Sequence, residues 1–154
     1  MSRTVLTYGT FDLFHVGHLN VLRRLRALGD RLIVGVSTDR FNGIKGKRPV
    51  VPFEQRIELV RAIRYVDDAF PEEEWDQKER DIRDNDVKIF GMGEDWRGKF
   101  DHLGALGVEV VYLPRTDGIS TTEMKRILSA FDQAHVAELK LTLDRIGRIV
   151  SELT

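Results

Sequence analysis

Two histidines three residues apart, His15 and His18, are the side chains of this sequence best suited to chemistry. They follow a short apolar run at Val5 and Leu6 and open a helical pattern in which leucine recurs every third residue from Leu19. Because residues three apart on a helix share a face, both imidazoles should point toward the carboxyl end of the strand, where open α/β sheets bind ligands. The positive end of the helix favours anions there. The spacing therefore predicts a phosphate site.

A histidine pair also has two other interpretations. One is zinc binding, although catalytic zinc pairs are usually spaced i, i+4 with a glutamate between them. The sequence has no cysteine, and His102 and His135 have no ligand-like spacing. The other is two unrelated histidines, which the Gly-Thr turn at a strand–helix junction argues against.

A second candidate cluster lies near the other end of the chain. The string Ser120-Thr121-Thr122-Glu123 matches a capping box at the start of a helix. Arg115 follows a predicted strand just upstream, and a guanidinium beside a helix N-terminus can engage phosphate oxygens in a bidentate fork. The alternative is that these hydroxyls only cap the helix.

Cationic side chains lie between the two clusters. Lys45 and Lys47 belong to a long segment, 38–52, that has no period and is predicted to be a loop; its glycines would let it close over a ligand and exclude water. Arg56 and Arg64 are eight residues apart on one predicted helix and roughly share a face. For both pairs the alternative is a solvated surface.

The elements that position these residues follow from apolar runs alternating with helical periodicity. Strands are predicted at Val5–Leu6, 31–37, within 65–71, 87–92 and 109–113. Helices are predicted from Leu19, at 54–63, at 77–85 as a polar surface helix, at 101–106, and from Ser120. This alternation predicts an α/β fold with a doubly wound, Rossmann-like parallel sheet, in a single domain with a C-terminal helical extension.

Composition narrows the class of protein. The chain has 154 residues, 42% hydrophobic and 32% charged, with a formal net charge of −1 and no cysteine. This balance predicts a single globular domain with no nucleic-acid or membrane partner, because such partners normally require a basic face. There is no signal-peptide core and no apolar run long enough to span a membrane, so we expect a cytoplasmic location.

Four strings carry a resemblance to a known family. Residues 9–18, Gly-Thr-Phe-Asp-Leu-Phe-His-Val-Gly-His, resemble the signature of the cytidylyltransferase-like nucleotidyltransferases, and residues 115–122 resemble the family's second signature, Arg-Thr-Glu-Gly-Ile-Ser-Thr-Thr. Asp117 replaces the usual glutamate, which keeps the charge on a shorter side chain. With 64–67 and 93–101, these strings are most similar to members whose acceptor is glycerol 3-phosphate. The resemblance runs from about Val5 to Ile127.

The resemblance implies transfer of the cytidylyl group of CTP to a small phosphorylated alcohol, most closely glycerol 3-phosphate, giving CDP-glycerol and pyrophosphate. Mg²⁺ is the implied cofactor, and the sequence does not identify its ligands. The implied catalytic residues are His15, His18, Lys45, Lys47 and Arg115. The implied nucleotide-binding residues are Gly9, Thr10, Phe11, His15, His18, Asp95, Trp96, Arg115, Thr116, Ile119, Ser120, Thr121 and Thr122. The implied acceptor-binding residues are Asp12, Asp39, Lys45, Arg56, Arg64, Asp67 and Trp75.

Two further functions stay open at this point. The first is a cytidylyl- or adenylyltransferase acting on another acceptor, such as ethanolamine phosphate, choline phosphate or a sugar-alcohol phosphate. The second is a catalytically silent nucleotide-binding module. Such a module would be expected to have lost a histidine or the string at 115–122, and this chain keeps both.

The C-terminal segment extends past the resemblance, so the sequence divides into a cytidylyltransferase-like domain, 1–131, and an amphipathic helix, 132–154. Six apolar residues in this helix alternate spacings of three and four, which is typical of a coiled-coil seam: Val136, Leu139, Leu143, Ile146, Val150 and Leu153. Because members of the family are typically dimers, we expect this helix to extend a homodimer contact. The alternative is that it packs on its own domain.

Overall fold

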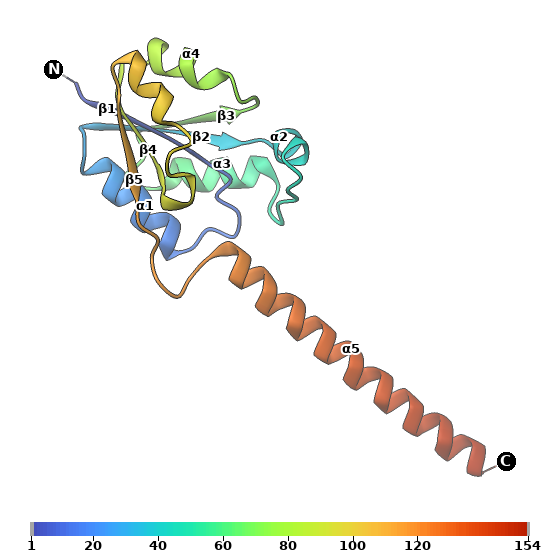
Figure 1. The fold of residues 1–154 in the computed structure, drawn as a ribbon. Coiled ribbons are helices and arrows are strands. Elements are labelled where there is room, and N and C mark those ends of the chain that lie inside the picture. Colours follow the sequence, from blue (N-terminus) through green and yellow to red (C-terminus); the bar gives the residue numbers. More distant parts are fainter. Residues whose placement is uncertain (1, 154) are drawn as a thin grey trace. The chain divides into compact units, whose positions relative to one another are not determined.

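The computed structural model describes residues 2–153, which fall into two compact units, the first ending at Gly118 and the second beginning at Ile119. The first unit contains a five-stranded sheet in which every pair of neighbours is parallel, in the order β3-β2-β1-β4-β5 (Figure 1). The strands are β1 (Thr4–Gly9), β2 (Arg31–Ser37), β3 (Asp68–Glu72), β4 (Val87–Gly93) and β5 (Glu109–Leu113). The predicted doubly wound α/β fold is confirmed.

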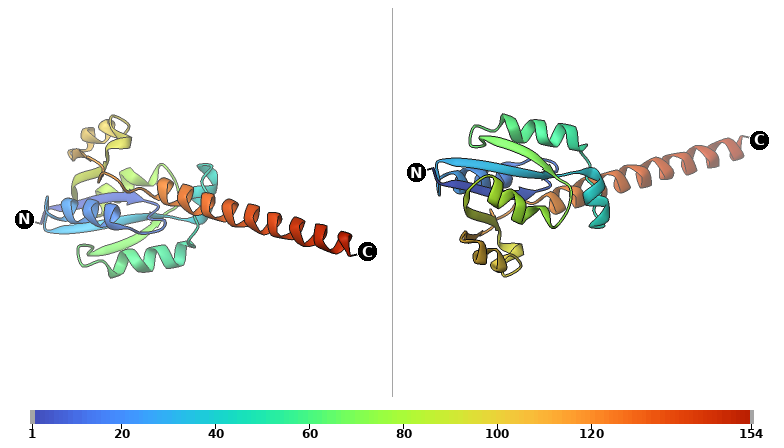
Figure 2. Two further views of the ribbon diagram at one scale, coloured as in Figure 1. Left: turned by 90° about the horizontal axis from the view of Figure 1, so that it is seen from below. Right: turned by 90° about the horizontal axis from the view of Figure 1, so that it is seen from above.

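Helices connect successive strands, as parallel pairing requires. They are α1 (Val16–Arg26), α2 (Asp39–Ile44), α3 (Phe53–Ala62), α4 (Gln77–Asp84) and the short 3-10 helices η1 (Glu94–Trp96) and η2 (Asp101–Leu106). Figure 2 shows α3 and η2 on opposite faces of the sheet.

Two hydrophobic clusters form the core, one on each face of the sheet. Because strand side chains alternate between faces, Val5 and its register partner Ile89 join the cluster under α1 and α3, whereas Leu6 and Phe90 join the cluster under α4 and η2. All four side chains are almost completely buried. The apolar runs are continuous because both faces are covered.

The strand order has a switch point at the middle of the sheet. From β1 the chain proceeds outward to β2 and β3 and then returns to place β4 on the other side of β1. The loops after β1 and β4 therefore diverge at the carboxyl edge, the edge at which all five strands end. Ligands bind in the crevice that such a divergence leaves.

Two predicted elements differ from the structure. The segment 38–52, predicted as a loop, begins with α2, whose six residues are too few to show a helical period; Thr38 caps it by accepting a hydrogen bond from the Phe41 N–H at 3.1 Å. The helix expected to carry both Arg56 and Arg64 ends at Ala62. Arg64 lies in the following turn, so the prediction that the two arginines share a helix face is wrong.

The second unit is one long helix, α5 (Thr121–Glu152). Ser120 caps it as predicted, with its hydroxyl oxygen accepting a hydrogen bond from the Glu123 N–H at 3.0 Å. The other half of the predicted capping box is absent, because the Glu123 carboxylate accepts from the Arg126 guanidinium instead of reaching back to Ser120. The six residues of the predicted seam are 52–82% exposed. Within residues 2–153, no helix is both long and apolar enough to span a membrane.

Candidate active site

The histidine corner, His15 and His18, is a reciprocal cap at the start of α1. His15 is the N-cap residue, and its Nδ1 accepts a hydrogen bond from the Gly17 N–H at 3.0 Å. The Nδ1 of His18 accepts from the backbone N–H of His15 at 3.2 Å. Because a backbone N–H can only donate, both Nδ1 atoms are unprotonated, and in the neutral rings the proton resides on Nε2.

Both histidines are held in the neutral form. Their rings stack with centroids 4.0 Å apart and planes 27° from parallel. Burial lowers the pKa of His15, and burial together with the neighbouring His15 lowers the pKa of His18 to about 4, against the opposing effect of Asp12. At neutral pH the corner therefore offers two uncharged Nε2–H donors whose ring orientation is set by the backbone.

The loop that leads into the corner is held by Asp12. Its buried carboxylate accepts hydrogen bonds from the backbone N–H groups of Val50 at 2.8 Å and Val51 at 2.9 Å. The flanking Phe11 and Leu13 have φ of 54° and 48°, a left-handed conformation that costs an L-residue about 1–2 kcal/mol. The predicted acceptor-binding Asp12 thus joins this loop to the segment before α3.

Three residues at the start of this loop, Gly9, Thr10 and Phe11, were predicted to bind nucleotide. A Cβ on Gly9 would lie only 2.8 Å from the Phe11 ring, so the close approach of ring and backbone requires glycine. The Thr10 hydroxyl donates to the side-chain oxygen of the buried Asn42 at 3.0 Å. Thr10 therefore ties the loop after β1 to α2.

Arg56, predicted to bind the acceptor, is completely buried beneath the carboxyl edge. Its Nη1 donates to the carbonyl oxygens of Thr10 and Ser37, both at 2.7 Å, and its Nε donates to the Val51 carbonyl at 2.8 Å. Its Nη2 donates to Asp39 at 2.7 Å. The guanidinium thus joins the loops after β1 and β2.

Asp39, another predicted acceptor residue, also belongs to this network. Its second carboxylate oxygen accepts from the Phe53 N–H at 3.1 Å, at the start of α3. Burial acts to raise the pKa of Asp39, but the hydrogen bonds from Phe53 and Arg56, together with the charge of Arg56, lower it overall. The Asp39 carboxylate therefore caps α3, whose N-cap residue is Pro52 and offers no side-chain cap.

The lysines reach the same edge from α2 and α4. The Nζ of Lys45 donates to the Ser37 hydroxyl at 2.9 Å and lies 3.6 Å from one oxygen of the buried Glu72. Lys78 donates to the other Glu72 oxygen at 2.8 Å. Burial lowers the pKa of Lys45, and Glu72 acts against that shift.

Glu72 and Lys78 were missed by sequence reasoning. The pattern at 77–85 predicted a polar surface helix, yet Gln77, Lys78 and Asp81 are buried. Their hydrogen bonds make that burial tolerable, because a buried charge is stable only when paired. Nothing in the local spacing distinguishes these residues from solvated ones.

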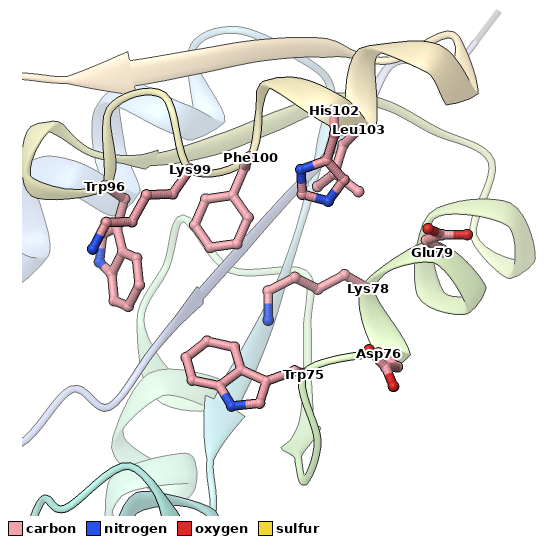
Figure 3. Close-up of a pocket in the computed structure, with 9 residues that line it drawn as sticks. All are labelled: Trp75, Asp76, Lys78, Glu79, Trp96, Lys99, Phe100, His102 and Leu103. Carbon is pink, nitrogen blue, oxygen red and sulfur yellow. The ribbon is translucent and has the colours of Figure 1, made fainter.

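A groove of about 670 Å³ opens beside Lys78 (Figure 3). It is lined by Trp75, Asp76, Lys78, Glu79, Trp96, Lys99, Phe100, His102 and Leu103. The predicted Trp75 and Trp96 come together here, with ring centroids 6.5 Å apart. The Nζ of the predicted Lys47 lies 5.8 Å from the Trp96 ring centroid, so the loop lysine reaches this groove.

The segment after β5 is positioned by α1. Asn20 donates to the hydroxyl of the predicted Thr116 at 3.1 Å, and Arg24 donates to the Pro114 carbonyl at 3.1 Å. The exposed Arg115 pairs with Asp95, with Nε 3.0 Å from the carboxylate. The structure therefore brings these two predicted residues together, whereas sequence reasoning missed Asn20.

Some predicted residues are not brought to this edge. Asp67 accepts a hydrogen bond from the Leu32 N–H at 2.7 Å, which places it where β2 begins, and Arg64 lies in the same connection before β3. Both are therefore at the amino edge, opposite the histidine corner. Ile119 and residues 120–122 belong to the second unit, and their predicted role in nucleotide binding stays a prediction.

Carboxylates are the side chains that a divalent cation such as Mg²⁺ would use as ligands here. Among residues 2–153, no group of three or more histidine or acidic side chains could hold a metal ion. The carboxylates of Asp12, Asp39 and Glu72 already accept hydrogen bonds from backbone or cationic donors. These residues do not fit an all-protein metal site.

Known proteins resemble this chain in sequence and in fold. A family model described as Cytidylyltransferase-like matches residues 6–127. Glycerol-3-phosphate cytidylyltransferase of Bacillus subtilis (strain 168) is 52% identical over 80% of this chain and 95% of its own length, and the Staphylococcus aureus (strain NCTC 8325 / PS 47) protein of the same name is 52% identical over 84% and 98%. The crystal structure of a lipopolysaccharide core biosynthesis protein from Thermoplasma volcanium GSS1 superimposes with a TM-score of 0.66 at 28% identity, over 76% of this chain and all of that one.

Proposed function

The chain belongs to the cytidylyltransferase-like family, and we propose that it transfers the cytidylyl group of CTP to glycerol 3-phosphate, giving CDP-glycerol and pyrophosphate. The observation that carries the proposal is the histidine corner. Two neutral imidazoles, each with Nδ1 bound to the backbone, present Nε2–H donors at the carboxyl edge of the sheet. The relatives at 52% identity, named for glycerol 3-phosphate and cytidylyl transfer, support the choice of substrates.

The reaction needs no general base. The second pKa of a phosphate monoester is about 6, so the acceptor phosphate is largely dianionic at neutral pH. One of its oxygens attacks the α-phosphorus of CTP, a new P–O bond forms, and the bond to the β-phosphate oxygen breaks to release pyrophosphate. Catalysis then depends on alignment of the two substrates and on stabilisation of the charge that develops on oxygen.

The donors of the site match these requirements. His15 and His18 donate from Nε2 to the phosphoryl oxygens. Because both imidazoles are uncharged, they need no counterion before the substrates bind. Lys45, Lys47 and Arg115 supply positive charge toward the triphosphate. Arg115 exchanges its partner Asp95 for phosphate when CTP binds, and Asp95 then remains beside Trp96 for contacts with the nucleoside. These roles follow the family resemblance and are supported by the placement of the five side chains of the first unit.

Mg²⁺ is proposed to accompany CTP. Magnesium usually keeps several waters and takes one or two carboxylates plus substrate phosphates, so it does not require an all-protein cage. Its ligands here would be mainly phosphate oxygens and water. A cytoplasmic location is part of the same proposal, because the reaction consumes CTP.

We also propose that the chain forms a homodimer in which the segment 132–154 contributes a contact. The exposed seam of α5 supports this, because six large apolar side chains of one helix face are left in contact with water. A seam of this length is marginal alone, so a further contact from the domain 1–131 would be needed.

Pyrophosphate release tests the proposed function. CTP and ATP are each combined with glycerol 3-phosphate, ethanolamine phosphate, choline phosphate and a sugar-alcohol phosphate in the presence of Mg²⁺. We expect release with CTP and glycerol 3-phosphate, and CDP-glycerol as the second product. Turnover with ATP but not CTP, or a preference of about 100-fold for another acceptor, which corresponds to roughly 2.7 kcal/mol in the transition state, would contradict the assignment.

A further inference from the structure

The ammonium group of Lys78 lies among three aromatic rings at the groove. The Nζ of Lys78 lies 4.5 Å from the ring centroid of Tyr8, 5.2 Å from that of Trp75 and 5.6 Å from that of Phe100. Figure 3 shows its side chain extending between Trp75 and Phe100. We call Lys78, Glu72 and these three rings the lysine cage. Rings in such an arrangement otherwise recognise cationic ligands, above all quaternary ammonium groups.

Lys78 is firmly held in this position. Its ammonium donates to Glu72 at 2.8 Å, and the two side chains are only 6% and 5% exposed. The Tyr8 ring beneath it is fixed at both ends. The hydroxyl donates to Asp81 at 2.6 Å, and a Cβ on Gly35 would lie 2.3 Å from the ring, so glycine is required there. The ring that faces the ammonium therefore has little freedom to move away.

Lys45 adds a second positive charge beside the cage. Lys45 shares the Glu72 carboxylate at 3.6 Å and lies over the rings of Phe41 and Trp75, at 4.4 and 5.6 Å. Two ammonium groups thus face one carboxylate in a largely buried place. Asp76 and Glu79 also line the groove, but both are exposed to water, which screens their charge.

We propose that Lys78 is a specificity-determining residue, whose ammonium fills the aromatic cage and so excludes acceptors with cationic head groups while admitting polyol phosphates. The inference rests on the proposed function and names the class of acceptor. A choline or ethanolamine group would meet both a filled cage and two like charges. An acceptor with hydroxyl oxygens, in contrast, can accept hydrogen bonds from lysine, which has three donors and no acceptor.

The test compares Lys78→Ala with the matched control Lys78→Arg. Alanine removes the charge and opens the space between the three rings, whereas arginine keeps a cation there. kcat/KM is measured with CTP and either glycerol 3-phosphate or choline phosphate. We expect the ratio of choline phosphate to glycerol 3-phosphate to rise about 30-fold in Lys78→Ala, the size of a desolvated cation–π contact. Lys78→Arg should keep the wild-type ratio. An unchanged ratio in folded Lys78→Ala overturns the inference.

A binding measurement separates this inference from the proposed function. The two tryptophans of the chain, Trp75 and Trp96, both line the groove, so their fluorescence reports on it. Tetramethylammonium chloride should change the fluorescence of Lys78→Ala at concentrations that leave the wild type unchanged, whether or not CDP-glycerol is made. If the Lys78→Ala substitution destabilises the fold by removing a partner of Glu72, the double variant Glu72→Gln/Lys78→Ala removes both charges and should show the same binding. Saturable binding of tetramethylammonium to the wild type would overturn the inference without any variant.

Discussion

The histidine corner and the lysine cage both present N–H donors at the carboxyl edge of the sheet, but different forces hold them there. The imidazoles are neutral and are oriented by backbone N–H groups within three residues of each other. The ammonium of Lys78 is charged and is oriented by a carboxylate and by rings from distant parts of the chain. Neutral donors suit the reacting phosphoryl group, because they are stable without a partner before the substrate binds. A buried charge, in contrast, requires a permanent partner. The two regions should therefore fail in different ways when perturbed.

The largest effect is expected at the histidine corner. Asparagine at position 15 or 18 can keep a hydrogen-bond acceptor near the Nδ1 position but loses the Nε2–H donor. We expect His15→Asn and His18→Asn each to lower kcat by about 10²–10³, as the loss of one preorganised donor does. The corresponding alanine variants should also lose the helix cap and about 0.5–2 kcal/mol of stability. Steady-state kinetics and urea unfolding measure the two effects, and near-normal turnover in an asparagine variant would contradict the assigned role.

At the lysine cage the main effect should be on stability. Glu72→Gln leaves two ammonium groups largely buried without a carboxylate, and breaking a buried ion pair in this way costs about 3–5 kcal/mol. The matched control is Glu109→Gln, which breaks the exposed pair with Arg3 and should cost no more than about 1 kcal/mol. Urea unfolding at neutral pH gives both values. Equal costs for the two variants would show that Glu72 is not a buried counterion.

The neutral state of His18 predicts a smaller effect, seen in the pH dependence of stability. Its pKa is about 4 in the folded protein and 6.5 ordinarily, so between these values the unfolded chain binds the proton more tightly. This contribution to stability is fully present above pH 6.5 and is lost as the pH falls toward 4. The free energy of unfolding of His18→Gln should fall less steeply than that of the wild type over this window. Parallel profiles would contradict a neutral, half-buried His18.

The smallest effect on the first unit is expected from removing part of α5. Deletion of residues 135–154 should lower the mass measured by light scattering from dimer to monomer, since the deleted segment carries the exposed apolar seam. The kcat should change little, because both the histidine corner and the lysine cage lie in the first unit. A full-length protein that is already monomeric would remove the case for this helix as an assembly element. An unchanged dimer after deletion would do the same.

The features predicted correctly from the sequence are those set by interactions between residues close together in the chain. The strand predicted at 31–37 coincides with β2, and the cap predicted at Ser120 is present, because periodicity and capping depend on residues within about four positions. The prediction that Arg64 shares a helix with Arg56 was wrong because long-range contacts end that helix. The turn that contains Arg64 is set by β3 pairing alongside β2, through contacts such as the hydrogen bond between Asp67 and Leu32, which are 35 residues apart.

The alternating α/β order, the histidine signature at a strand–helix junction and the apolar seam of the last helix can each be recognised from neighbouring residues. Which charged side chains are buried, and which partners they meet, depends on how the elements pack. Arg56 bonds to the Thr10 carbonyl 46 residues away, and the Tyr8 hydroxyl meets Asp81 across 73 residues. A charged residue in a polar helix has the same local pattern whether it faces water or a carboxylate. Its role therefore depends on partners that only the packed sheet brings within hydrogen-bond distance.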